Sequence, residues 1–313
     1  MFCVPGSYVQ LDLYKAAAER GYKQWTRIYY DWESLQEKPI PPLTDEDKTG
    51  QIAVGGVKLF MDGSMSNRTG WLREPYPGTT DEFGMQTNTD ELMGSALAFA
   101  KENAIMIAFH AMGDRAVEHV LDFYGDEEPW LTDRPSVRIE HGSVMYQDLV
   151  DKLNSKRMNF GVCTNVDFFF CEYDSYSENL SEDQFANTYP AKRMYDQIDS
   201  FALTSDCPAT TWTDPDNVFM QVQAAVTRMA YNGKPIVPEQ ALTVPQALMS
   251  YTGRARRVGD FGDNGTIEVG RYANWVTLTE DVFAVPQDRI IDVRAAGTWI
   301  QGEQVFDHKV DRY

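Results

Sequence analysis

A short apolar run that ends in a histidine constrains the fold of this chain more than any other stretch. Residues 105–109 are mostly apolar, His110 follows directly, and patterns with helical spacing flank the run. Such a run between two helices is typical of a buried strand in a parallel sheet. In α/β barrels the chemistry lies at the carboxyl ends of these strands. The run therefore predicts a parallel α/β fold, in which His110 is either a packed core histidine or a metal ligand.

The same alternation of strand and helix recurs along the chain. With the run before His110 it makes six predicted strands, the other five at residues 23–30, 54–61, 136–140, 159–164 and 201–205. Helical patterns are found at residues 8–20, 88–100, 116–124, 149–153, 218–229 and 243–251. The last of these begins with a capping box, Thr243 and Gln246. This alternation predicts parallel α/β architecture.

Four segments interrupt the alternation of strand and helix. We predict a loop with a short helix at residues 33–53, a long ordered loop at 64–88, and an aromatic and acidic insertion at 165–195. From residue 265 onward, turns precede short strands at 273–278, 290–295 and 298–301, which indicate a separate β-unit.

Composition excludes several classes of function. The net charge of −19 over 313 residues repels phosphate backbones, which argues against nucleic-acid binding. No apolar run approaches the roughly 20 residues that span a bilayer. The amino terminus lacks the pattern of a signal peptide, and the four cysteines contain no C-x-x-C pair, so we expect a cytoplasmic protein with free thiols.

Four polar residues stand at corresponding places, in or just after apolar strands. They are Lys58, His110, His141 and Asp206. Each has a plain alternative, because a lone strand histidine is usually a core residue and Asp206 could cap a turn. Lys58 is harder to explain, since burying an ammonium is costly unless it is paired or modified. Their recurrence at strand ends favours a functional site.

The chemistry of this set suits a divalent metal. Two imidazoles and a carboxylate are ligands for zinc or a similar ion. Lys58 cannot ligate as an ammonium, but its carbamate could bridge two metals about 3.5–4 Å apart that share a hydroxide nucleophile. Asp206 could then hold metal and accept the proton of the attacking water.

Six stretches of this sequence resemble amidohydrolase family 3 of the metal-dependent amidohydrolase superfamily, in the branch that includes N-substituted formamide deformylases. They occur in order and cover most of residues 57–278. They are VKLFMDGSMSNRTGWLREPY (57–76), FHAMGDRAVEHVLD (109–122), RIEHGSV (138–144), LTSDCP (203–208), LTVPQALMSYTGRAR (242–256) and GTIEVGRYANWVTL (265–278).

The resemblance implies a distorted (β/α)8 TIM-type barrel with a small β-sandwich domain, and hydrolysis of a carbon–nitrogen bond. Matched residue by residue, Lys58 falls on the bridging carboxylated lysine of barrel strand 4. His110 and His141 fall on the metal ligands of strands 5 and 6, and Asp206 on the acidic residue of strand 8.

The largest departure from the family is at the first barrel strand, which the resemblance expects to end in a His-x-His or His-x-Asp pair. The histidines are at 110, 119, 141 and 308, and none forms such a pair. We therefore expect about strands 3–8 of a barrel at residues 1–258 and part of a β-sandwich at 259–313. A smaller departure is Asn274, where the family usually has Asp.

Other residues keep two readings each. Asp62 and Asp114 either orient a ligand or cap the next segment. Arg138 either pairs with a carboxylate near the site or simply lies on a strand. The aromatic group of the insertion either forms a lid or packs on itself. No role is expected for His119, His308 or Cys207, whereas Ser64 and the loop that follows could line a pocket.

These inferences predict a zinc-type hydrolase that acts on an amide, formamide or cyclic amide, with one or two ions and with Lys58 in carboxylated form. The alternative is a non-catalytic remnant, or a subunit that needs a partner chain to supply the first-strand histidine pair. Because an incomplete barrel has two unpaired edges, association with a second copy is also expected.

Overall fold

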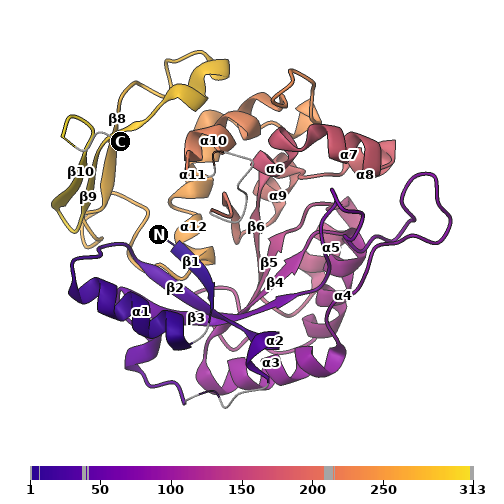
Figure 1. Ribbon diagram of the computed structural model, residues 1–313, viewed down its shortest axis with the longest axis horizontal. Helices are drawn as coiled ribbons and strands as arrows, with labels where there is room; N and C mark the ends of the chain where they lie inside the picture. The colour runs from indigo at the N-terminus through magenta and orange to yellow at the C-terminus, as the bar shows by residue number, and fades with distance from the viewer. Residues whose placement is uncertain are drawn as a thin grey trace.

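A seven-stranded parallel sheet organises the larger part of the molecule (Figure 1). In the computed structural model, the described residues are 2–6, 8–36, 40, 42–207, 214 and 216–310. The strands lie side by side in chain order, and each neighbouring pair is parallel. They are β1 (Phe2–Gly6), β2 (Thr26–Asp31), β3 (Ile52–Phe60), β4 (Met106–Ala111), β5 (Val137–His141), β6 (Phe160–Thr164) and β7 (Phe201–Leu203).

Helices follow most strands and cover the outer face of the sheet, as α1, α3, α4 and α5 show in Figure 1. The predicted parallel α/β architecture is confirmed. The helices are α1 (Tyr8–Glu19), α2 (Trp32–Leu35), α3 (Asp90–Asn103), α4 (Asp114–Tyr124), α5 (Gln147–Ser155), α6 (Val166–Cys171), α7 (Tyr173–Asn179), α8 (Glu182–Ala186), α9 (Ala191–Gln197), α10 (Val218–Thr227), α11 (Val244–Tyr251) and α12 (Ala255–Val258), with short 3-10 helices η1 (Glu46–Lys48), η2 (Pro238–Gln240) and η3 (Gln287–Asp292).

The strand β1 is one more than the six that the sequence predicts. Its residues include Pro5 and Gly6, which are depleted in strand interiors, so the pattern does not read as a strand. Proline is tolerated on an edge strand, and β1 pairs only with β2 within the described residues. No pairing joins β7 to β1 there, so these residues form an open sheet rather than a closed barrel.

Helix boundaries follow the local chemistry. The capping box of Thr243 and Gln246 is present at the start of α11, as predicted. The helix predicted from residue 88 begins at Asp90 as α3, and its cap is Thr89, whose hydroxyl accepts from the amide of Leu92. Asn88 lies before the cap and is buried.

The small sheet near the carboxyl end is antiparallel, with strand order β10-β9-β8. Its strands are β8 (Trp275–Leu278), β9 (Ala295–Ile300) and β10 (Glu303–Asp307). The strand predicted at residues 290–295 is wrong, because η3 occupies its first half. Ile290 and the C-cap residue Val293 are buried, and their spacing of three is helical. The strand β10 was missed because its residues are mostly exposed.

The insertion at residues 165–195 folds into the helices α6 to α9. Its aromatic side chains pack on one another rather than forming an exposed lid, since Phe168, Phe169 and Tyr176 are buried. The ring of Phe169 contacts Tyr176, Phe185 and Tyr189. The long loop at residues 64–88 is ordered and contains no helix or strand, as predicted.

Candidate active site

Lys58, His110 and Glu140 lie together because of the register of three neighbouring strands. Phe60 of β3 pairs with His110 of β4, and His110 pairs with Glu140 of β5. Paired residues in a sheet share a face, and residues two apart on a strand share it too. Lys58, two residues before Phe60, therefore lies on the same face as His110 and Glu140. The strand β3 is buried almost throughout, which explains how its lysine is enclosed.

Glu140 is the partner of Lys58, and sequence reasoning missed it. The Lys58 ammonium forms an ion pair with Oε2 of Glu140. The guanidinium of Arg138 donates to the other oxygen, Oε1, over 2.6 Å. Arg138 also donates to the hydroxyl of Tyr29 and to the carbonyl of Val258. Of its two readings, the pairing of Arg138 with a carboxylate near the site is confirmed. The signal for Glu140 was the two-residue alternation that places it beside Arg138.

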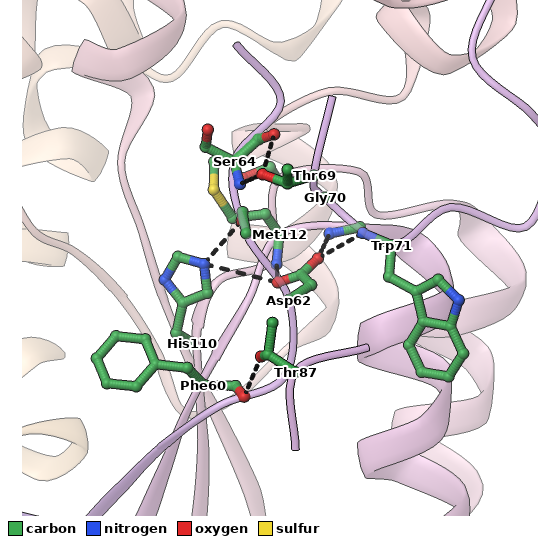
Figure 2. Close-up of polar contacts among 12 residues, drawn as sticks. Phe60, Asp62, Ser64, Thr69, Gly70, Trp71, Thr87, His110 and Met112 are labelled. Carbon is green, nitrogen blue, oxygen red and sulfur yellow. Dashed lines mark hydrogen bonds and ion pairs between the residues drawn. The ribbon is translucent and has the colours of Figure 1, made fainter. Parts of the chain in front are cut away.

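His110 is held through one ring nitrogen (Figure 2). Its Nε2 lies 2.9 Å from the carbonyl oxygen of Gly63 and 3.6 Å from Oδ1 of Asp62. Since a carbonyl only accepts, Nε2 carries the proton, and the lone pair of the neutral ring is on Nδ1. Burial, together with the charge of Lys58, lowers the pKa of His110 to about 4. The ring is thus neutral at pH 7, which is the form that binds metals.

His141 reaches His110 from the end of the next strand through an unusual backbone conformation. Alternation would turn the side chain that follows Glu140 to the opposite face, but the φ of His141 is +72°. With this left-handed turn, the two imidazole rings lie 4.6 Å apart between centroids. Backbone strain of this kind is concentrated at functional sites. Burial lowers the pKa of His141 well below its ordinary value, and the nearby His110 and Lys58 act in the same direction.

Asp206 follows β7 and also has a left-handed backbone, with φ of +53°. The residue is exposed, but loss of hydration around its carboxyl raises the pKa, while the charge of Lys58 opposes this shift. Asp206 is therefore within electrostatic reach of Lys58.

Asp62 anchors the strand ends around His110. Its buried carboxylate accepts hydrogen bonds from the backbone amides of Met112, Gly113 and Trp71, at 2.9, 2.7 and 2.9 Å (Figure 2). Burial raises the pKa of Asp62 to about 7, and the three amides act against this shift. Of its two predicted roles, the position near His110 favours ligand orientation, and its bonds tie the loop after β3 to the end of β4.

The long loop approaches α4 very closely at Gly113. A Cβ atom there would lie 1.9 Å from the carbonyl oxygen of Trp71, so only glycine fits. That carbonyl accepts from the amides of Arg115 and Ala116 in the first turn of α4. Asp114 accepts from the amide of Arg73 and binds the same loop. The loop thus closes one side of the strand ends.

The remaining candidates lie apart from this group. His119 is on α4 and pairs with Asp90, away from the strand ends. His308 lines a separate cavity of about 680 Å³, with Asn217, Phe219 and Arg294 among its walls. None of the four predicted site residues lines that cavity. Cys207 is a free thiol, as predicted.

The two imidazoles fit as ligands of a divalent metal. Both are neutral at pH 7 and adjacent, and Nδ1 of His110 is left free by the bond to Gly63. Within the described ranges, however, no three His, Cys, Asp or Glu side chains are grouped closely enough to hold an ion. Lys58 in its ammonium form has no lone pair to offer. The structure thus brings together two imidazoles whose chemistry suits a divalent metal.

Known proteins resemble this chain in sequence and fold. The profile of the amidohydrolase family matches residues 7–306. YtcJ of Bacillus subtilis is 26% identical over 280 residues, which are 88% of this chain and 50% of YtcJ. The N-substituted formamide deformylase of Arthrobacter pascens is 22% identical over 275 residues, 88% of this chain and 49% of that protein. The chain spans about half the length of these relatives.

A solved structure shows the same fold. An uncharacterized metal-dependent hydrolase from Pyrococcus horikoshii has a TM-score of 0.74 and 23% identity, covering 92% of this chain and 57% of that one. In the part of this chain that is described, no helix is both long and apolar enough to cross a membrane. With the profile match over nearly its whole length, the chain belongs to the amidohydrolase family.

Proposed function

We propose that this chain is a metal-dependent hydrolase that cleaves the carbon–nitrogen bond of an amide, formamide or cyclic amide. The observation that carries the proposal is the neutral, adjacent pair of His110 and His141 at the carboxyl ends of β4 and β5. Family membership supports hydrolysis, and a related protein is an N-substituted formamide deformylase. Zinc is the proposed ion, because imidazole and carboxylate are ligands that suit it.

In this proposal each residue has a separate task. His110 and His141 hold the ion, which when bound polarises the substrate carbonyl and makes water nucleophilic at neutral pH. Asp206 accepts the proton of the attacking water and returns it to the leaving nitrogen. Asp62 and Gly63 fix the orientation of His110.

Hydrolysis is tested by measuring release of amine from N-substituted formamides and cyclic amides, using the metal-free chain before and after addition of zinc. We expect release only with zinc, and loss of release in the Asp206→Asn variant. Amine release that is equal with and without zinc would contradict metal dependence. Absence of release from every amide, with zinc bound, would contradict the proposed substrate class.

We also propose that Lys58 becomes carboxylated and contributes ligand oxygens. In the structure, an ion pair with Glu140 competes with this modification. Carboxylation requires the neutral amine to attack carbon dioxide and lose a proton, which yields an anion. The ion pair with Glu140 instead stabilises the ammonium. The extent of carboxylation should therefore depend on Glu140.

Treatment with ¹³C-bicarbonate and zinc is expected to give a carbamate signal in the carbon NMR spectrum. The signal should be absent in Lys58→Met and stronger in Glu140→Gln, because loss of the carboxylate charge favours the neutral amine. A signal that persists in Lys58→Met would contradict carboxylation of this residue.

The unpaired edges of the parallel sheet support a second candidate function. Within the described residues, β1 and β7 each leave one edge of the sheet unpaired. Unpaired edges are places where another chain can add strands. The alternative proposal is therefore a subunit whose activity requires a second copy or a partner chain, which light scattering on the purified chain would reveal as an oligomer.

A further inference from the structure

Two enclosed polar atoms without a hydrogen bond lie at the junction of β5, β6 and α6. They are Nδ1 of His141 and Oδ1 of Asn165. His141 is 5% exposed and Asn165 is fully buried. The two side chains contact each other. A buried polar atom without a partner destabilises the folded chain, so the pair requires an explanation.

The surroundings define which way the Asn165 amide points. Its Nδ2 donates to the carbonyl oxygen of Thr204 over 2.8 Å, which identifies the other terminal atom as the acceptor oxygen. On the same side, the hydroxyl of Thr164 donates to the carbonyl of His141 over 2.7 Å. The ring of Phe168 is in the first turn of α6, and its centroid lies 5.6 Å from that of the His141 ring. The beginning of α6 is thus packed directly over His141.

We propose that Asn165 is a positioning residue that selects the tautomer of His141. Its Oδ1 accepts a hydrogen bond from Nδ1–H of the imidazole, which satisfies both enclosed atoms with one bond. The lone pair of the ring is then on Nε2. At His110 the opposite holds, because Nε2–H is bonded to Gly63 and the lone pair is on Nδ1. The two rings therefore offer different nitrogens to a metal ion between them, Nδ1 from His110 and Nε2 from His141.

The same amide links two parts of the site. Through Nδ2 it holds the carbonyl of Thr204, two residues before Asp206. Through the proposed bond from Oδ1 it also orients His141. One side chain therefore couples the orientation of a ligand on β5 to the segment after β7. Where it concerns metal, this inference rests on the proposed function, but the tautomer is a property of the metal-free chain.

The test compares two variants of nearly equal size. Asn165→Asp keeps an acceptor oxygen toward His141, and Asn165→Leu removes it. Long-range proton–nitrogen NMR on metal-free protein with ¹⁵N-labelled histidine, at mildly alkaline pH, reports which ring nitrogen carries the proton. Signals are assigned with His110→Gln and His141→Gln. If the leucine variant does not fold, Asn165→Ala takes its place.

We expect His141 to be protonated at Nδ1 in the unmodified chain and in Asn165→Asp, and to shift toward Nε2 in Asn165→Leu. His110 should stay protonated at Nε2 in all three. Protonation of His141 at Nε2 in the unmodified chain would overturn the inference, as would an unchanged His141 spectrum in Asn165→Leu.

Zinc affinity gives a second readout. Loss of a residue that orients a histidine ligand typically lowers metal affinity by about 10–100-fold, which we expect for Asn165→Leu and not for Asn165→Asp. Equal affinity of Asn165→Leu and the unmodified chain would overturn the positioning role. A chain that binds no zinc but shows Nδ1–H at His141 would contradict the proposed function and support the assignment of the tautomer.

Discussion

Replacement of His110 by alanine is expected to lower zinc affinity by more than about 100-fold, beyond what loss of an orienting partner costs, and to abolish hydrolysis. The imidazole is one of two neutral rings that the strand ends bring together. Removing it leaves His141 without its neighbouring ligand. Affinity is measured by calorimetric titration of metal-free protein with zinc.

The matched control is His119→Ala on the helix that follows the same strand. His119 is partly exposed and pairs with Asp90, so its loss should leave zinc affinity unchanged. Circular dichroism establishes that both variants are folded. If His110→Ala bound zinc as tightly as His119→Ala, His110 would not be a ligand.

Replacement of Asp62 by alanine is expected to reduce the free energy of unfolding by about 3–5 kcal/mol. The change leaves the buried amides of Met112, Gly113 and Trp71 without an acceptor, and each such donor costs about 1–3 kcal/mol, part of which water can recover. These amides belong to the segment that follows β4 and to the long loop, so His110 should lose its fixed orientation as well. Denaturant unfolding measures the effect.

The control for this change is Asp81→Ala in the same loop. Asp81 is exposed, so the expected effect on the free energy of unfolding is within about 0.5 kcal/mol. A loss of stability at Asp62 no larger than at Asp81 would show that the three hydrogen bonds do not anchor the loop.

The parallel α/β architecture was predictable from local pattern, because buried strands and amphipathic helices each leave a periodic signal. Lys58 and His110 were found because a polar side chain within an apolar run is conspicuous. The strand β1 was missed since it is short and contains Pro5 and Gly6. Whether the sheet closes depends on pairing between distant strands, which local pattern does not encode.

The contacts of the site could not be predicted from the sequence where the backbone departs from regular strand geometry. Alternation alone would turn His141 away from His110, and only its positive φ brings the rings together. The bonds of Asp62 go to amides on the long loop and on the segment between β4 and α4, and residue types do not reveal such partners. The role of Asn165 depends on two enclosed atoms whose proximity appears only in the folded chain.

The most direct test of the proposed function is the metal content of the purified chain by mass spectrometry, after incubation with zinc and exhaustive dialysis. The proposal predicts at least one zinc ion per folded chain, retained on dialysis and lost in His110→Ala. A chain that is folded by circular dichroism and retains no divalent metal would contradict it.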